Sequence, residues 1–282
     1  MRVLVTGASG QLGYDVCREL ERRGIPFRGT SSKTLDITDA EAVLKTLEMY
    51  RPDAVIHCAA YTAVDKAEKE PGRAFAVNGT GTHNVAAACA RVGAKMVYLS
   101  TDYVFPGTGD APYEVGDAVG PVNVYGQSKL AGERAVLERL ERYFIVRISW
   151  VFGINGNNFV KTMLRLAQNH SEVRVVCDQI GSPTYTADLA PLLCDMIESE
   201  QYGVYHATNE GVCSWAKLAE ETFRQAGKKV MVYPISTAEY SAKAARPLNS
   251  RMSKKKLKTA GFTLLPTWED ALRRFIEVLP ED

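Results

Sequence analysis

The sequence predicts an α/β protein built on a doubly wound, parallel sheet. Over the first 150 of its 282 residues, strand-length apolar runs alternate with helical patterns, and a glycine-rich turn follows the first run. Strands that are apolar on both faces are typical of parallel sheets covered by helices on each side. Right-handed crossovers then place helices on both faces of the sheet.

The expected elements alternate regularly at first and less regularly later. Strands are predicted at 3–5, 25–27, 54–59, 95–100 and 144–149, separated by helices at 11–23, 39–49, 72–92 and 124–142. Beyond residue 150 we expect helices at 157–168, 186–199, 214–226 and 267–278, short strands at 173–178 and 203–208, and a polar stretch at 234–250. This predicts a Rossmann-like domain at 1–150, which also receives part of the later chain, and a smaller α/β substrate-binding region mainly at 151–282. The boundary is not clean, and the second region should pack over the carboxyl edge of the sheet, where such folds bind ligands.

Composition excludes several classes of function. The formal net charge is +1, from 34 Lys and Arg against 33 Asp and Glu, so no bulk positive field would gather nucleic acid or anionic lipid. No apolar run approaches the ~18 residues of a membrane span. The six cysteines are scattered, without metal-binding spacing, which indicates free thiols in a reducing cytoplasm. We therefore expect a cytoplasmic protein with no membrane or nucleic-acid partner and no metal-binding cluster.

A glycine-rich turn at the end of the first strand predicts a dinucleotide site. Gly7, Gly10 and Gly13 follow the run Val-Leu-Val and open an amphipathic helix. Backbone N–H groups and the helix dipole at such a turn favour a diphosphate. A tight turn that needs its glycines only for packing is the alternative.

The end of the second strand predicts which dinucleotide binds. The usual acidic residue that holds the adenosine ribose is missing from 27–33, which instead contains Arg28, Ser31, Ser32 and Lys33. A 2′-phosphate fits this segment, whereas a ribose diol would lack its usual acceptor. We predict NADPH in preference to NADH, with Arg28 at the 2′-phosphate. An ordinary surface arginine is the alternative.

A catalytic set follows the fourth strand. Thr101 lies just past its carboxyl end, and Tyr125 and Lys129 stand four residues apart in the next helix, on one face. Hydride transfer to a carbonyl carbon leaves charge on oxygen, so an acid must supply a proton. We expect Tyr125 to be that acid, Lys129 to lower its pKa and bind the nicotinamide ribose, and Thr101 to polarise the carbonyl. Two exposed residues on a helix would be the better interpretation if the glycine turn and Thr101 were absent.

These motifs resemble a known family. Thr-Gly-Ala-Ser-Gly-Gln-Leu-Gly at 6–13, Ser-Thr-Asp-Tyr-Val-Phe at 100–105 and Tyr-Gly-Gln-Ser-Lys at 125–129 are similar to the extended short-chain dehydrogenase/reductases. Within them, the segments 59–68, 147–153, 156–164, 178–184 and 246–250 resemble the dTDP-4-dehydrorhamnose reductase family. The resemblance implies reduction of the 4-keto group of dTDP-4-dehydro-6-deoxy-L-mannose to dTDP-L-rhamnose, a precursor of cell-surface polysaccharide, with NAD(P)H.

The resemblance also implies roles for individual residues. The catalytic set would be Thr101, Tyr125 and Lys129. The cofactor would contact Gly7, Ser9, Gly10, Gln11, Leu12, Gly13, Asp36, Ile37, Ala59, Ala60 and Thr62, in addition to Tyr125 and Lys129. The sugar would meet Asp102, Tyr103 and Trp150, and the dTDP moiety Asn158 and Arg246. A core tryptophan at Trp150 and a structural salt bridge at Arg246 are the alternatives.

Some members of this family form dimers around Mg²⁺. Asp15 stands near the expected first ligand, but the acidic pair expected after 181–190 is missing, and Asp188 is the one candidate there. The resemblance therefore argues against a metal-bridged dimer, and a homodimer without metal is left open.

Two rival functions belong to similar folds. A non-catalytic NADP-binding regulator, similar to the β subunit of methionine adenosyltransferase, would share Tyr125 and Lys129 but diverge in 147–164. A nucleotide-sugar epimerase would need an acidic residue after the second strand, which is missing here. A nucleotide-sugar dehydratase would need a carboxylate pair after Thr101, where Asp102 and Tyr103 stand instead.

Overall fold

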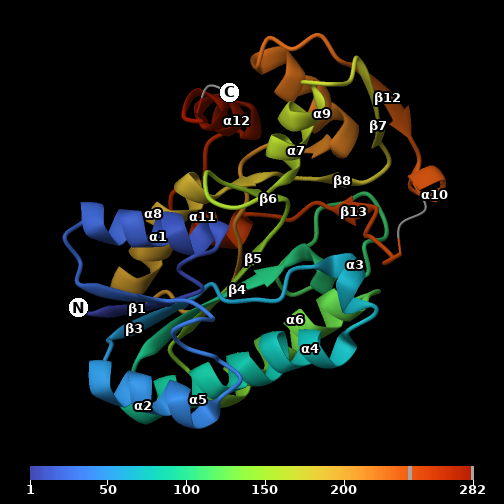
Figure 1. Ribbon diagram of the computed structural model, residues 1–282. Coiled ribbons are helices and arrows are strands. Elements are labelled where there is room, and N and C mark those ends of the chain that lie inside the picture. The colour runs from blue at the N-terminus through green and yellow to red at the C-terminus, as the bar shows by residue number, and fades with distance from the viewer. Residues whose placement is uncertain (241–242, 281–282) are drawn as a thin grey trace.

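The centre of the protein is a six-stranded parallel sheet with the strand order β10-β5-β4-β3-β1-β2 (Figure 1). The computed structural model describes residues 1–240 and 243–280. The strands of this sheet are β1 (Val3–Thr6), β2 (Phe27–Thr30), β3 (Ala54–His57), β4 (Lys95–Thr101), β5 (Tyr143–Ile148) and β10 (Gly203–His206). The predicted doubly wound fold is confirmed, and its sixth strand comes from the second half of the chain.

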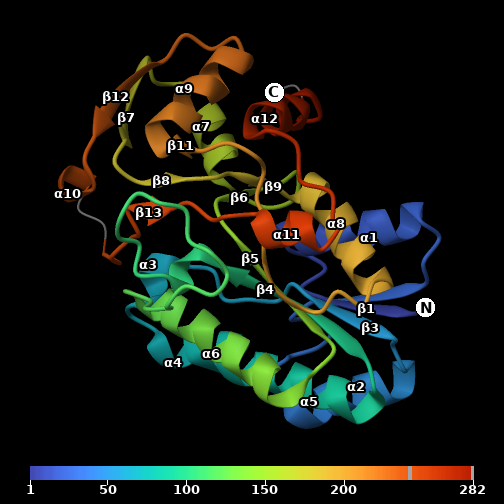
Figure 2. The same ribbon diagram turned by 180° about the vertical axis from the view of Figure 1, so that it is seen from behind.

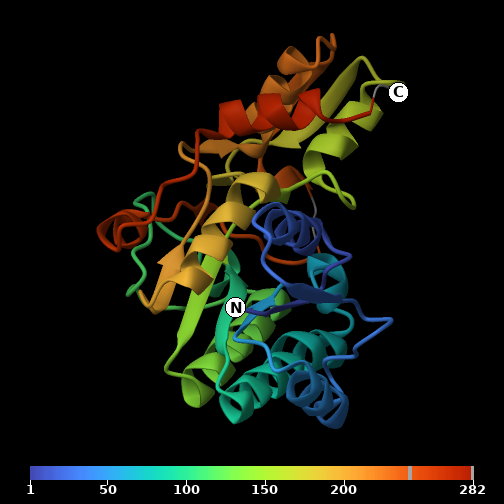
Figure 3. The same ribbon diagram turned by 90° about the vertical axis from the view of Figure 1, so that its left-hand side faces the viewer.

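Helices cover both faces of the sheet (Figure 3). One face carries α1 (Gln11–Arg22) and α8 (Thr186–Glu198), and the other carries α2 (Ala40–Tyr50), α5 (Thr82–Val92) and α6 (Val124–Arg139). Val3 and Val5 enter the first core, whereas Leu4 enters the second. This alternation explains why the strands read as continuous apolar runs, because each strand is buried on both sides.

The predicted helix at 72–92 is one helical path with a change of pitch. It comprises α4 (Pro71–Phe75), a π-helical segment η1 (Ala76–Gly81) and α5, and a short α3 (Val64–Ala67) precedes it. Asn78, inside the π-helical segment, accepts from the backbone N–H of Tyr61 at 2.8 Å and donates to Ser128 of α6 at 2.9 Å. The irregular segment therefore braces the helix that contains the predicted catalytic pair.

The second strand lies later than predicted. The apolar run ends at Phe27, but parallel pairing with β1 begins there, at Val3↔Phe27, and continues to Thr30. β2 is an edge strand of the sheet, so its exposed positions tolerate Arg28 and Gly29. An apolar run therefore gave the wrong bounds, because half of this strand faces solvent.

The remainder of the chain forms a smaller lobe over the carboxyl edge of the sheet. Its larger elements are α7 (Phe159–Leu166), β7 (Glu172–Val176), α9 (Trp215–Gln225), β12 (Met231–Ile235) and α12 (Trp268–Glu277). Shorter elements are β6 (Val151–Phe152), β8 (Ile180–Gly181), β9 (Thr184–Tyr185), β11 (Cys213–Ser214), α10 (Thr237–Tyr240), β13 (Asn249–Ser250) and α11 (Lys255–Thr259). In the first half of the chain, η2 (Asp102–Val104) directly follows β4 and packs on α6. α11 packs against β10, and Figure 2 shows α11 on the side of the molecule that faces the viewer.

Several strands of this lobe were not predicted, and β12 is the longest of them. β12 falls partly inside the stretch that was expected to be polar, and it contains Pro234. It pairs with β7 in a two-stranded sheet, where each strand has a free edge that can accommodate proline. Among the described residues, no helix is long and apolar enough to cross a membrane.

Candidate active site

A cavity of about 630 Å³ lies between the carboxyl edge of the main sheet and the smaller lobe. The predicted site residues that line it are Gly10, Gln11, Leu12, Ala60, Thr62, Thr101, Asp102, Tyr103, Tyr125, Lys129 and Trp150. The structure therefore brings the glycine turn, the end of β4 and the start of α6 to a single space, although they are far apart in sequence.

The glycine turn is shaped by close backbone approaches. Gly7 has φ of 68°, and a Cβ there would lie 2.6 Å from the backbone nitrogen of Ala59. A Cβ at Gly13 would lie 2.2 Å from the carbonyl oxygen of Gly7. No side chain caps the amino end of α1, and its first turn contains no acidic residue. These features leave backbone N–H groups and the positive end of the helix dipole directed at the cavity, as a diphosphate requires.

Thr101 and Asp102 form a hydrogen-bonded pair at the end of β4. Both are buried, and the Thr101 hydroxyl donates to Oδ1 of Asp102 at 2.9 Å. The hydroxyl of Ser250, on β13, donates to Oδ2 of the same carboxylate. Burial raises the pKa of Asp102 to about 6, while the bonds from Ser250 and Thr101 act in the opposite direction. This carboxylate therefore titrates close to neutral pH.

Lys129 is buried and tied to the sheet. Its Nζ donates to the carbonyl oxygen of Leu99 at 2.6 Å and lies 4.2 Å from the centre of the Tyr98 ring. Burial lowers the pKa of Lys129 to about 7, although the nearby Glu133 acts in the opposite direction. Glu133 itself is paired with Arg147 at 2.8 Å, below the site.

The pKa of Tyr125 differs from the prediction. Burial raises it above the ordinary value for a phenol, and interaction with Thr101 only partly offsets this. The expectation that Lys129 lowers this pKa is wrong for the structure as it stands, because the Lys129 ammonium is directed at Leu99 and Tyr98. Tyr125 therefore holds its proton firmly at neutral pH. Its ring meets that of Tyr103 edge-on, with centroids 5.4 Å apart.

Trp150 forms one wall of the cavity together with Trp215. Trp150 has φ of 50°, in the left-handed region, and its ring stacks on Trp215 with centroids 3.8 Å apart. A Cβ at Gly181 would lie 2.9 Å from the Trp150 ring and 3.0 Å from the Cβ of Ser250. Only glycine at this position lets the ring and β13 approach so closely.

The sequence interpretation missed several lining residues. They are Cys58, Val64, Leu99, Ser100, Ile148, Ser149, Val151, Gly156, Asn157 and Trp215. Most flank a predicted residue and could have been found as strand-end neighbours. Trp215 gave no such signal, because it opens α9 and comes to Trp150 only through the tertiary fold.

Seven predicted cofactor residues lie outside the lining of the cavity: Gly7, Ser9 and Gly13 in the glycine turn, and Arg28, Asp36, Ile37 and Ala59 in or after β2 and β3. Arg28 is exposed inside β2, opposite Leu4, with its charge near Tyr50 at the end of α2. Asp36 accepts from the backbone N–H of Thr38, which holds the pKa of Asp36 below its ordinary value. Ile37 is buried, and Ala59 contacts the glycine turn through its backbone.

Two predicted nucleotide residues make contacts within the protein. Asn158 caps α7 and donates to the side chain of Gln11 at 3.0 Å, which joins the lobe to the glycine turn. Arg246 makes a bidentate pair with Asp65 of α3, at 2.7 and 3.2 Å. The structure therefore contains the salt bridge that the sequence left as one alternative for Arg246.

The two acidic residues considered for Mg²⁺ are also engaged. Asp15 accepts from the hydroxyl of Thr186, and Asp188 is paired with Arg274 at 2.7 Å and accepts from Asn209. Within residues 1–240 and 243–280, no group of three or more His, Cys, Asp or Glu has the arrangement of a metal site.

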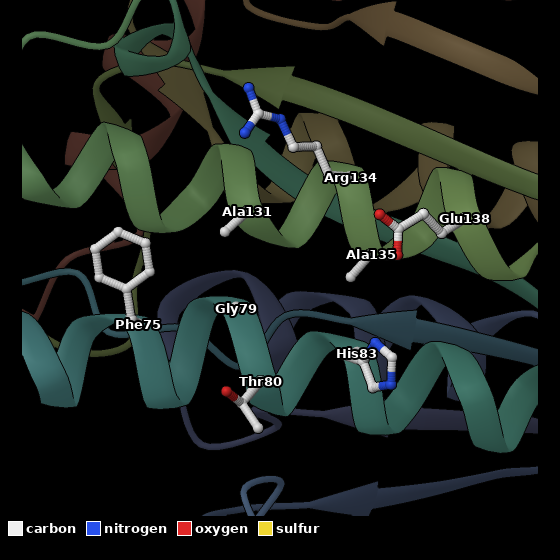
Figure 4. Close-up of a pocket in the computed structure, with 8 residues that line it drawn as sticks. All are labelled: Phe75, Gly79, Thr80, His83, Ala131, Arg134, Ala135 and Glu138. Atoms are coloured by element: carbon white, nitrogen blue, oxygen red, sulfur yellow. The ribbon is translucent and has the colours of Figure 1, made fainter.

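A second hollow lies on the outer surface, between the helical path α4–η1–α5 and α6 (Figure 4). Its rim includes Phe75, His83, Arg134 and Glu138, which project from the two helical segments. These residues all differ from the predicted site residues. The chemistry-bearing side chains are therefore concentrated in the cavity at the sheet edge.

The fold and the cavity together define an extended short-chain dehydrogenase/reductase. Residues 1–280 match the family model described as the RmlD substrate binding domain. The chain belongs to the dTDP-4-dehydrorhamnose reductase family.

Full-length relatives support this membership. The dTDP-4-dehydrorhamnose reductase of Streptomyces griseus is 46% identical over 278 residues, which cover 96% of this chain and 91% of that protein. A spore coat polysaccharide biosynthesis protein of Bacillus subtilis (strain 168) is 41% identical, with 98% and 97% covered. A crystal structure of the dTDP-4-dehydrorhamnose reductase of Bacillus anthracis in complex with NADP superposes with a TM-score of 0.96, at 47% identity and 98% coverage of both chains.

Proposed function

We propose that this protein uses NADPH to reduce the 4-keto group of dTDP-4-dehydro-6-deoxy-L-mannose to dTDP-L-rhamnose. The observation that carries the proposal is the cavity in which Thr101, Tyr125 and Lys129 meet the glycine turn. Membership of the reductase family supports the same substrate class.

NADPH would lie along the glycine turn and supply the hydride. The contact residues proposed from the sequence are Gly7, Ser9, Gly10, Gln11, Leu12, Gly13, Ala59, Ala60 and Thr62, with Asp36 and Ile37 toward the adenine. The uncapped amino end of α1 supports a diphosphate there, because its N–H groups lack side-chain partners. The relative from Bacillus anthracis was crystallised in complex with NADP.

The protein's own residues would handle the proton. Tyr125, whose pKa burial raises, holds a proton that it can give to the oxygen at C4. The Thr101 hydroxyl would bond the same oxygen. Lys129, with a pKa near 7, would bond the nicotinamide ribose.

The sugar and nucleotide would occupy the side of the cavity formed by the smaller lobe. Asp102, Tyr103 and Trp150 line this space and are proposed to meet the sugar. Arg246 would reach the diphosphate by sharing or exchanging its bond with Asp65, and Asn158 would act nearby. This division of labour assigns cofactor binding mainly to 1–150 and substrate binding mainly to 151–282.

The 2′-phosphate of NADPH is proposed to bind at the end of β2. Arg28 was the residue predicted from the sequence, and Ser31, Ser32 and Lys33 follow it. Ser31 and Thr34 close a tight turn directly after the strand, which places Lys33 on the exposed part of this turn. Its position beyond the strand end supports Lys33 as a second candidate.

The location and assembly follow the same reasoning. All six cysteines are free thiols, which fits a reducing compartment and supports the predicted cytoplasmic location. A nucleotide sugar is the proposed small-molecule partner, and a homodimer remains open to measurement.

One assay separates this proposal from its rivals. The purified protein is mixed with NADPH and dTDP-4-dehydro-6-deoxy-L-mannose, and NADPH absorbance is followed while the product is identified by mass. Stoichiometric oxidation with formation of dTDP-L-rhamnose supports the reductase. Tight NADPH binding without turnover would instead indicate a regulatory protein, and turnover without net NADPH consumption an epimerase.

A further inference from the structure

Three buried side chains form a continuous series of hydrogen bonds, in which the neighbours Thr101 and Asp102 are joined by the distant Ser250. Ser250 donates to Oδ2 of Asp102, and Thr101 donates to Oδ1 of the same carboxylate. The exposed fractions of Ser250 and Asp102 are both 2%, so water does not compete for these bonds. At one end of this hydrogen-bonded series Thr101, a member of the catalytic set, lines the cavity, and at the other end Ser250 lies behind the cavity wall.

The backbone fixes Ser250 in this position. β13 pairs with β8 in the register Ser250↔Gly181, and the neighbouring Asn249 donates to the carbonyl oxygens of Thr108 and Ala111. Because Gly181 has no side chain, β13 lies close enough for Ser250 to reach under Trp150. The serine hydroxyl is therefore supplied by a rigid strand and not by a flexible loop.

We propose that Ser250 is a positioning residue for the reduction, which orients the Asp102 carboxylate and, through it, the Thr101 hydroxyl. This inference rests on the proposed function. An ionised Asp102 carboxylate accepts strongly from both hydroxyls. A protonated Asp102 can instead donate to the Thr101 oxygen, which leaves the Thr101 hydroxyl proton free for the sugar oxygen. Ser250 fixes which carboxylate oxygen faces Thr101. By favouring the ionised form it also sets the pH above which Thr101 gives its proton to Asp102 and below which that proton is free for the sugar oxygen.

The other titratable and charged groups around Asp102 do not replace Ser250 and Thr101 in controlling its protonation state. Tyr103 on η2 and Tyr125 on α6 face it, and burial raises the pKa of each phenol, so both are neutral near the pKa of Asp102. Glu133 on α6 and Arg147 on β5 are joined by two hydrogen bonds, and the pair also bonds Ser100 and Val115. Directly after β13, the guanidinium of Arg251 donates to Asn249.

The test compares Ser250→Ala with Ser250→Thr, which keeps the hydroxyl. Ser182→Ala is the matched control, because it also removes a buried serine hydroxyl, one that donates to the carbonyl oxygen of Gly211. The first readout needs no substrate: the infrared carbonyl band of protonated Asp102, assigned by its loss in Asp102→Asn, is titrated. Loss of a bond to a charged group should raise this pKa by roughly one to two pH units in Ser250→Ala only.

The second readout is the pH profile of kcat/KM for the sugar substrate. We expect the Asp102-dependent limb to move upward by the same amount in Ser250→Ala and to return in Ser250→Thr. Coincident titrations and profiles for Ser250→Ala, Ser182→Ala and the unaltered protein would overturn the inference. If the unaltered protein does not turn over the sugar, the proposed function fails, while the infrared titration still decides whether Ser250 controls Asp102.

Discussion

The indole rings of Trp150 and Trp215 lie 3.8 Å apart, with an angle of 14° between their planes. Trp215 is held by a hydrogen bond from its Nε1 to Gln179 at 3.1 Å, and Gln179 in turn donates to Thr237. The wall of the cavity is therefore a braced pair of rings, in which Trp215 supports a residue whose backbone lies in an unusual region.

Replacing Trp215 should weaken sugar binding without affecting the cofactor. Trp215→Ala removes a stacked ring, worth roughly 0.5–1.5 kcal/mol beyond burial, so we expect KM for the sugar to rise about three- to tenfold. Trp215→Phe should lose less, and the dissociation constant of NADPH should not change. Phe262→Ala is the control, because it removes a partly buried ring that packs against a different core, edge-on to Tyr205. An unchanged KM in Trp215→Ala would show that the pair is not part of the substrate wall.

Tyr125→Phe should remove the proton donor and little else. We expect kcat to fall at least about a hundredfold, in the range typical of lost acid catalysis, with NADPH affinity within about twofold. Steady-state kinetics and a fluorescence titration with NADPH measure the two effects. Tyr113→Phe serves as control, since its hydroxyl bonds Thr108 outside the cavity. Substantial turnover by Tyr125→Phe would require a different acid.

The coenzyme preference should depend on the segment after β2. Lys33→Ala and Arg28→Ala are compared through their ratios of kcat/KM with NADPH and NADH. Because Arg28 lies inside the strand near Tyr50, we expect Lys33→Ala to lower the ratio about tenfold and Arg28→Ala to lower it less. The reverse order would confirm the residue predicted from the sequence, and two unchanged ratios would move the 2′-phosphate elsewhere.

Arg246 should affect substrate affinity more than the chemical step. Arg246→Ala is expected to raise KM for the sugar nucleotide by about tenfold or more while kcat changes by less than about threefold. Asp65→Asn removes the ion-pair partner of Arg246 but leaves the charge of Arg246 in place, so Asp65→Asn should raise KM less than Arg246→Ala. Lys255→Ala, which breaks an exposed pair with Glu114, is the control. Equal kinetics for all variants would leave Arg246 with a structural role alone.

Asp102 should make stability depend on pH in an unusual direction. Its pKa is raised from 3.8 to about 6, so between these values the folded protein binds a proton that the unfolded chain does not. Stability relative to Asp102→Asn should therefore fall as pH rises through this window, by at most roughly 3 kcal/mol. Urea unfolding at about pH 4 and about pH 7 measures the difference.

A second aspartate, Asp36, should make stability change with pH in the opposite direction. The pKa of Asp36 is lowered by the Thr38 backbone N–H, so the stability gained over Asp36→Asn should increase as pH rises through the acid range. The same direction for both variants would contradict the assignment for Asp102.

Local patterns predicted those parts of the site that single segments of chain provide. The glycine turn and the pair Tyr125 and Lys129 depend on spacing along one strand–helix unit, and the structure brings them together at the cavity. The support around them depends on tertiary pairing. Ser250 and Trp215 reach the site because β13 joins β8 and α9 opens beside Trp150, and neither event leaves a periodic signal in the sequence.

Edge position and burial explain the remaining differences. β2 was misplaced because an edge strand need not be apolar, and β12 was missed because a two-stranded sheet tolerates Pro234. The pKa of Tyr125 was predicted in the wrong direction because spacing gives no measure of burial, which here outweighs the hydrogen bond with Thr101.

The return of β10 to the main sheet has a consequence for synthesis of the protein. Until residue 206 has left the ribosome, β5 keeps an unpaired edge, and the core beneath α1 lacks the apolar side chains of α8. A nascent or truncated chain that ends near residue 150 would expose both a strand edge and a bare apolar face, which favours aggregation. We therefore expect the first half of the chain to depend on the second half for a sheet that is fully paired and covered.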